Sequence, residues 1–213
     1  MLSYPHEVFY QSDVSSMPKE EILMIVSVAI CIIITALIML PVLLWMRRKE
    51  RWTYKRFVGY WMLAIYFSVV YQLTGGPTVD YIRWDPNVDL IPLLGMMGDI
   101  KNSLLNIALF VPLGLLLPLL WKRYRDVRYT LAFSFGLSLV IELSQLFTYR
   151  ATDVDDLITN TLGGILGWCT ARMLFKHGKE EKEKDRALLL LALGFGIKFL
   201  TEPIQALLYY VIT

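Results

Sequence analysis

The sequence predicts an all-α protein that crosses a membrane about six times, with both termini outside the cytoplasm. Of its 213 residues, 56% are hydrophobic, and the mean hydropathy is +0.50, whereas soluble domains are about 45–50% apolar. The apolar residues lie in blocks of roughly 18–26, the length that a helix needs to cross a hydrocarbon layer about 30 Å thick. Little chain is left for a soluble domain, so we expect a single polytopic helical bundle with short loops.

Six apolar blocks follow a polar N-terminal stretch. The first block is too long for the core of a signal peptide, so we expect it to be retained as a helix. The sixth is interrupted by Lys198, Glu202 and Pro203, so it is either one kinked spanning helix or two shorter segments. Lys198 and Glu202 are four residues apart and are expected to pair. The expected helices are residues 22–45, 57–73, 103–121 (with Asn102 or Ser103 as N-cap), 129–147, 157–175 and 187–212.

The distribution of basic residues predicts the orientation. Sixteen of the 21 Lys and Arg residues lie in three short segments, residues 46–56, 122–128 and 172–186. The alternate segments carry only Lys19, Arg83, Lys101 and Arg150. Cytoplasmic loops of membrane proteins are enriched in Lys and Arg. The three basic segments are therefore expected inside, and attraction to phospholipid explains them without any nucleic-acid partner.

Polar residues concentrate at the predicted outer ends of the third, fourth and fifth helices. Glu142 lies inside an apolar block, where an ionisable residue is costly and is a functional candidate by default. Gln145 shares its helical face, and Asp156 and Asn160 are four apart on the next helix. We expect these side chains to converge in an outward-facing polar pocket: Asn106, Glu142, Gln145, Arg150, Asp153, Asp156 and Asn160. Helix-packing roles are expected for Pro112, Gly114, Gly163, Gly164 and Gly167.

Two motifs in this region resemble those of the VanZ-like family of bacterial membrane proteins. Residues 106–118 follow the spacing N-x3-F-x-P-x-G-x2-L-P, and residues 142–167 follow E-x2-Q-x4-R-x2-D-x2-D-x3-N-x2-G-x3-G. The resemblance covers residues 60–175. It divides the chain into an extracytoplasmic tail (1–20), an additional N-terminal helix with its basic loop (21–56), a VanZ-like four-helix core (57–175), and a charged linker with a C-terminal helix (176–213).

The resemblance implies a multi-pass protein of the bacterial cytoplasmic membrane that confers resistance to glycopeptide antibiotics of the lipid-tailed, teicoplanin type. It does not supply a mechanism. The polar pocket suggests binding of the antibiotic or of a lipid-linked cell-wall precursor, with Arg150 holding an anionic group. The partners expected are therefore membrane lipids and one of these two ligands.

Three alternatives stay open. The polar residues could be wholly structural, acting as caps, an ion pair and an interhelical hydrogen bond. The protein could be a metal-dependent enzyme acting on a lipid headgroup, with a divalent cation on Glu142, Asp153 and Asp156 as its cofactor. It could also be a lipid transporter or flippase, although no inverted repeat is evident. The sequence offers no clear nucleophile, no histidine near these residues and no zinc-type spacing, so the binding hypothesis is preferred to the enzyme.

Overall fold

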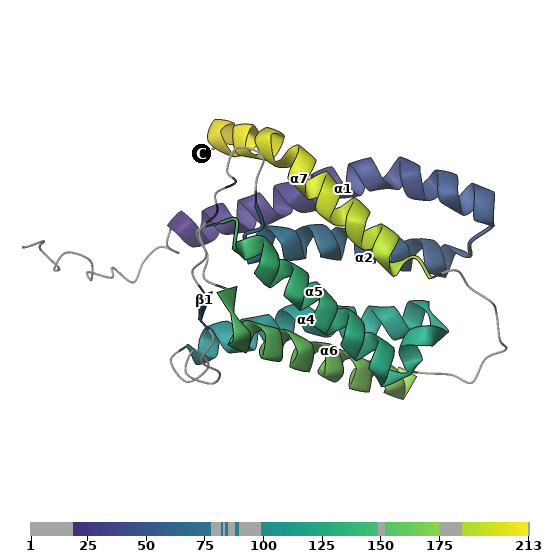
Figure 1. The fold of residues 1–213 in the computed structure, drawn as a ribbon. Helices are drawn as coiled ribbons and strands as arrows, with labels where there is room; N and C mark the ends of the chain where they lie inside the picture. Colours follow the sequence, from purple (N-terminus) through teal and green to yellow (C-terminus); the bar gives the residue numbers. More distant parts are fainter. Residues whose placement is uncertain are drawn as a thin grey trace, which may run out of the picture.

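The computed structural model describes residues 19–77, 82, 84, 88–89, 99–148, 152–174 and 185–212. Within these residues the chain folds into six long helices that run back and forth between two ends of a bundle (Figure 1). A 3-10 turn, η1, joins the third helix to the fourth. The helices are α1 (Lys19–Glu50), α2 (Tyr54–Thr74), α4 (Ile100–Leu120), α5 (Val127–Gln145), α6 (Val154–Leu174) and α7 (Ala187–Ile212), and η1 is Lys122–Arg125.

Five of the helices are long and apolar enough to cross a membrane, namely α1, α2, α4, α5 and α7. This confirms the predicted class of an all-α transmembrane bundle. All six expected helices are present, and α6 has the length of a span but is not among the five. The first turn of α6 carries Asp155 and Asp156, and Arg172 lies in its last turn. These charges and the amide of Asn160 lower the hydropathy of a helix that has the length of a span.

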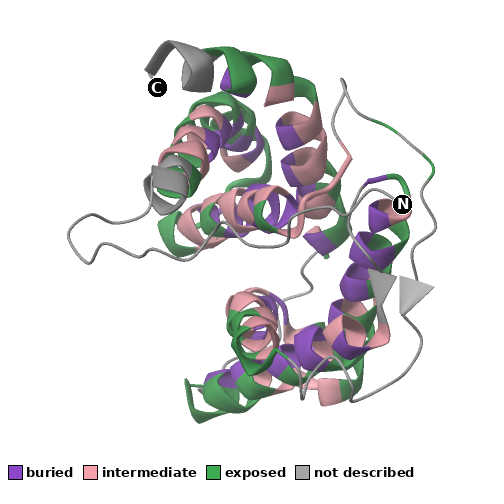
Figure 2. Cartoon of the chain, turned by 90° about the vertical axis from the view of Figure 1, so that its left-hand side faces the viewer, coloured by how far each residue is buried: buried purple, intermediate pink, exposed green. Residues whose placement is uncertain are grey.

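Contacts divide the helices into two groups. In one group α4 and α5 both pack against α6, and in the other α2 packs against α1 and α7. The groups are joined chiefly where α2 meets α4. Figure 2 shows buried positions turned toward neighbouring helices, whereas exposed positions cover the outer surface. Large apolar side chains such as Leu37, Leu105 and Leu166 are among the exposed residues, as expected of a surface that faces lipid.

Close packing of α4 against α6 depends on glycine. A Cβ added at Gly163 would collide with the carbonyl group of Ile107, and one added at Gly167 would collide with that of Val111. Small residues let two membrane helices approach until their backbones touch. The two glycines thus lie at the contact for which the sequence suggested them, together with Gly114 and Gly164, which face each other across it.

The described parts of the three basic segments lie at one end of the bundle (Figure 1). Arg186, which precedes α7, forms an ion pair with Glu50 at the end of α1, and Arg123 of η1 lies 3.7 Å from Asp185. The first residues of α1 and the last of α7 lie at the opposite end (Figure 1). This arrangement is what alternating basic loops require, and the assignment of the basic end to the cytoplasm stays a prediction.

Several helix boundaries differ from the expected ones. Helix α4 begins at Ile100, because the carboxylate of Asp99 accepts a 3.0 Å hydrogen bond from the backbone N–H of Asn102. Asp99 is therefore the N-cap, where Asn102 or Ser103 was expected. Helix α7 is continuous through Pro203, which excludes the alternative of two shorter segments.

An unexpected contact joins two connections at the end of the bundle opposite the basic segments. β1 (Val88–Asp89) pairs in parallel with β2 (Thr152–Asp153), so that Val88 lies opposite Thr152 and Asp89 opposite Asp153. Two-residue strands leave no periodic sequence signal, so this pairing was not predictable from alternation of apolar and polar residues.

Candidate functional site

The polar residues predicted on α4 and α6 meet near the end of the bundle opposite the basic segments. The side-chain amide of Asn106 donates a 2.6 Å hydrogen bond to the carboxylate of Asp156. One turn further along α6, the amide of Asn160 donates a 2.9 Å hydrogen bond to the hydroxyl of Ser138 on α5. Asp156 and Asn160 therefore connect α6 to both of its neighbours within one helical turn.

Helix α5 contributes a buried polar stripe, which comprises Thr130, Ser134, Ser138, Glu142 and Gln145. Residues three or four apart share one face of a helix, and all five are at most 4% exposed. The stripe begins near the basic end, where the Thr130 hydroxyl donates to the carbonyl of Tyr124. It ends where the Gln145 amide donates a 3.0 Å hydrogen bond to the carbonyl of Thr74 at the end of α2.

Glu142 occupies the centre of the predicted site. It is 4% exposed and lies one turn beyond Ser138, the residue that accepts the hydrogen bond from Asn160. A carboxylate in the apolar part of a bundle is costly unless its surroundings supply hydrogen bonds or charge.

The structure places the acidic residues of α6 differently from the expectation in one respect. Asp155, which was not among the predicted site residues, is 2% exposed, whereas Asp156 is only half-buried and faces Asn106. Both carboxylates lie in the first turn of α6, where the helix dipole favours negative charge. The side chains of Arg150 and Asp153 lie outside the described part of the structure, so their predicted roles stay predictions.

Two buried amide acceptors of the site have no hydrogen-bond partner among the described residues. They are the side-chain carbonyl oxygens of Asn160 and Gln145, whose amide nitrogens are both engaged. Buried polar atoms are normally satisfied by protein or by water. The arrangement can therefore accept hydrogen bonds from hydroxyl or amide groups of water or of a ligand.

The predicted divalent cation would need three acidic ligands. Among the described side chains no group of three His, Cys, Asp or Glu residues is placed to hold a metal ion. Glu142 and Asp156 belong to the described residues, but the side chain of the third predicted ligand, Asp153, does not. The residues that could hold a cation are thus two carboxylates with neighbouring amide oxygens, a set of ligands that suits Mg²⁺ or Ca²⁺ in kind but is short in number.

The hydroxyl residues of α5 were missed by sequence analysis. Ser134 and Ser138 precede Glu142 at intervals of four residues, and Thr130 continues the series. Serine and threonine are common in membrane helices, where they bond their own backbone, so each alone is a weak signal. The regular spacing over about three turns was the available clue, because it places every member on the face that carries Glu142.

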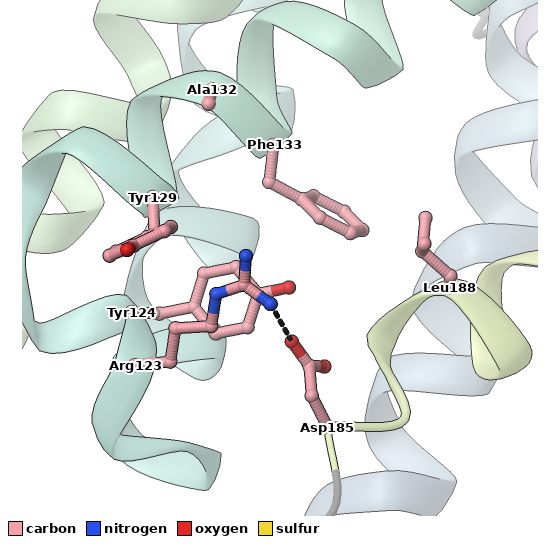
Figure 3. Close-up of a pocket in the computed structure, with 7 residues that line it drawn as sticks. All are labelled: Arg123, Tyr124, Tyr129, Ala132, Phe133, Asp185 and Leu188. Carbon is pink, nitrogen blue, oxygen red and sulfur yellow. Dashed lines mark ion pairs between the residues drawn. The ribbon is translucent and has the colours of Figure 1, made fainter.

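A cavity lies at the basic end of the bundle (Figure 3). Its volume is about 380 Å³, and its lining includes the ion pair of Arg123 with Asp185 and the ring of Phe133. Burial, followed by the hydrogen bond and the negative charge of Asp185, raises the pKa of Tyr124 well above its usual value. Tyr124 is therefore a neutral phenol at neutral pH.

These features define a polytopic membrane protein with an interior polar site between three of its helices. The family model described as VanZ/LLP1 matches residues 23–176, and the chain belongs to this family. The match begins well before residue 60, so it includes α1, which the sequence had suggested as an addition to the core; α7 lies outside it.

One curated relative supports the same assignment. The chain is 33% identical over 99 residues to Protein VanZ of Enterococcus faecium. The alignment covers 45% of this chain and 59% of the length of that protein. No solved structure matches the chain.

Proposed function

We propose that this protein acts in the bacterial cytoplasmic membrane and lowers susceptibility to lipid-tailed glycopeptide antibiotics of the teicoplanin type. In this proposal a polar pocket between α4, α5 and α6 faces outward and binds the antibiotic or a lipid-linked wall component. Membership of the VanZ/LLP1 family supports the phenotype. The orientation rests on the basic residues, which lie at the opposite end of the bundle from the pocket.

The proposal of a pocket depends on one observation, a set of hydrogen bonds that joins three helices. Asn106, Asp156, Asn160 and Ser138 come from three helices and form two hydrogen bonds one helical turn apart. Interhelical hydrogen bonds in membranes contribute only about 0.6 kcal/mol on average. That stability alone is a weak reason to bury Glu142 and Asp155 beside them. A site that recognises polar groups of a ligand accounts for the acidic residues and for the open acceptor of Asn160.

The resistance of a susceptible host that expresses the protein tests the proposal. Expression should raise the minimal inhibitory concentration of a lipid-tailed glycopeptide more than that of a glycopeptide without a tail. Glu142→Gln and Asn106→Ala should abolish the increase, whereas Asn102→Ala, one turn nearer the end of α4, should preserve it. Equal membrane levels of all variants, measured by immunoblot, are required for the comparison. Resistance that survives both site substitutions would contradict the proposal.

A binding experiment separates recognition from catalysis. Purified protein is incubated with the antibiotic or with a lipid-linked wall precursor, with and without Mg²⁺. Saturable binding without a product supports a binding site. A product that requires Mg²⁺ and disappears in Glu142→Gln would instead support the metal-dependent enzyme.

A further inference from the structure

A second buried charge lies in the other half of the bundle, between α2 and α7. The side chain of Lys198 is 2% exposed and forms an ion pair with Glu202, which lies one turn further along α7 and is 23% exposed. Removing two charges from water costs several kcal/mol per ion, and pairing offsets this cost only in part. Ionisable residues within membrane helices are accordingly candidates for a functional site.

A cavity adjoins this ion pair. Its volume is about 110 Å³, and it is lined by Tyr71, Gln72, Gly75, Gly76, Lys198 and Glu202. One water molecule needs roughly 10–15 Å³ of such space, so the cavity holds several waters or one small polar group. At its rim α2 ends in Gly75, whose φ of 66° is left-handed, a conformation that glycine adopts without strain. A Cβ at Gly76 would lie 2.6 Å from the ring of Tyr71, so glycine brings the backbone directly over that ring.

Gln72, which lines this cavity, carries an unsatisfied acceptor. Its amide nitrogen donates a 3.0 Å hydrogen bond to the hydroxyl of Ser27 on α1, which fixes the orientation of the amide. The carbonyl oxygen of the same amide is buried and has no hydrogen-bond partner among the described residues. A group that donates hydrogen bonds is therefore the complement of this atom.

The charges define the chemistry of the ligand. An ammonium group has three N–H donors, of which the ion pair with Glu202 uses one, and lysine binds phosphate as a point charge. A ligand with negative charge alone would bring that charge beside the carboxylate of Glu202. A zwitterion avoids this repulsion when its phosphate faces Lys198 and its ammonium faces Glu202 and the oxygen of Gln72.

We propose that this cavity binds a phosphoethanolamine group, the headgroup of a zwitterionic phospholipid with a primary ammonium. The same two helices expose Leu73 and Leu200 on their surfaces, against which acyl chains can lie. Two of the six lining residues, Lys198 and Glu202, belong to α7, which lies outside the residues that match the family model. The site is thus independent of the pocket between α4, α5 and α6, and either proposal can fail without the other.

Lipid retention by the purified, full-length protein tests the proposal. Native mass spectrometry compares phosphatidylethanolamine, phosphatidylcholine and phosphatidylglycerol with identical acyl chains. Phosphatidylcholine carries a trimethylated ammonium, which has no N–H to donate to Gln72. We expect the ethanolamine lipid to be retained about tenfold more than the other two, because it alone forms charge-assisted hydrogen bonds to both acceptors. Equal retention of the three lipids would overturn the proposal.

Variants assign the preference to this cavity. Lys198→Met combined with Glu202→Gln removes both charges, so that neither is left buried alone, and Gln72→Leu removes the acceptor. Both proteins should lose the preference, whereas Lys101→Met, at the exposed start of α4, should keep it. Gln72→Leu serves as the test if the double variant is not monodisperse in detergent. A preference that persists in a monodisperse double variant, or in Gln72→Leu, would refute the site.

A titration with soluble headgroup esters distinguishes a membrane lipid from a free phosphoethanolamine ester as the ligand. Glycerophosphoethanolamine is titrated against its trimethyl analogue, glycerophosphocholine, in the same measurement. Selective binding of the soluble ethanolamine ester, or of the ethanolamine lipid, supports the proposed chemistry. Tighter binding of the lipid identifies the membrane leaflet as the source.

Discussion

The side-chain amide of Asn106 donates a 2.6 Å hydrogen bond to the carboxylate of Asp156, 50 residues further along the chain. This bond ties α4 to the first turn of α6 at the end of the bundle opposite the basic segments. It also fixes the register of the two helices, because the glycine contacts that follow, beginning with Gly163 against Ile107, lie on the same interface.

Substitution of Asn106 should reveal the charge of its partner. Asn106→Ala removes one interhelical hydrogen bond, which is worth about 0.6 kcal/mol on average and at most about 1.7 kcal/mol. Asn106→Asp should lower the thermal midpoint in detergent further, because it places two carboxylates in contact. Addition of Asp156→Asn to Asn106→Asp should raise the midpoint again. Identical midpoints for the alanine and aspartate variants would show that Asp156 is not charged in the folded protein.

Helix packing predicts a contrast between two glycines. Gly167→Ala should destabilise the bundle by about 1–3 kcal/mol, because its methyl group would meet the backbone of α4 and force the helices apart. Gly136→Ala on α5 is the matched control, since a Cβ there meets nothing within 4 Å. It should be neutral or slightly stabilising, because alanine favours helix over glycine. Thermal unfolding in the same detergent measures both.

Cysteine labelling tests the orientation of the membrane spans. In a background of Cys31→Ser and Cys169→Ser, Lys101→Cys should react with a membrane-impermeant maleimide in intact cells. Arg123→Cys in η1 should react only after permeabilisation. The reason is the excess of Lys and Arg in the segments that lie at the same end of the bundle as η1. Reaction of Arg123→Cys in intact cells would place the polar pocket on the cytoplasmic side and remove the basis for antibiotic binding.

The N-cap of α5 should show a dependence on pH. The side chain of Arg128 and its backbone N–H both donate hydrogen bonds to the carboxylate of Asp126 and lower its pKa below the usual 3.8. The ionised carboxylate therefore contributes stability above its usual pKa, and the contribution is lost as the pH falls through the lower folded-state value. Asp126→Asn should have a lower thermal midpoint than the parent at pH 7, and the difference should shrink as the pH falls below the usual pKa of 3.8.

Much of the fold was predictable because the thickness of the bilayer sets the length of each spanning helix. Blocks of about 20 apolar residues mark the helices directly, and the predicted ranges lie within a few residues of the observed ones for α2, α4, α5, α6 and α7. The ion pair of Lys198 with Glu202 was likewise predictable from a spacing of four. Boundaries were less accurate, because Asp99 caps α4 three residues before the expected start.

The hydrogen-bond partners of the candidate site residues were less predictable than the identity of the residues themselves. The motif residues Asn106, Asp156 and Asn160 indicated one face of each helix, but not that Asn160 bonds Ser138 on α5 or that Gln145 reaches α2. Such pairings depend on how helices distant in sequence rotate and pack, for which the helical period carries no information. The burial of Asp155 instead of Asp156 has the same origin, since neighbouring positions on a helix differ by about 100° in direction.

The polarity of α6 has a consequence for how the protein reaches the membrane. A helix that begins with Asp155 and Asp156 and carries Asn160 is a poor candidate for partitioning into lipid by itself. The amide N–H of Asn160 donates a hydrogen bond to Ser138 of α5, and the carboxylate of Asp156 accepts one from Asn106 of α4. During synthesis these two helices emerge first, so we expect α6 to leave the translocation channel only together with them. If α4 is deleted, α6 should therefore fail to insert into the bilayer, whereas α1 and α2 should still insert.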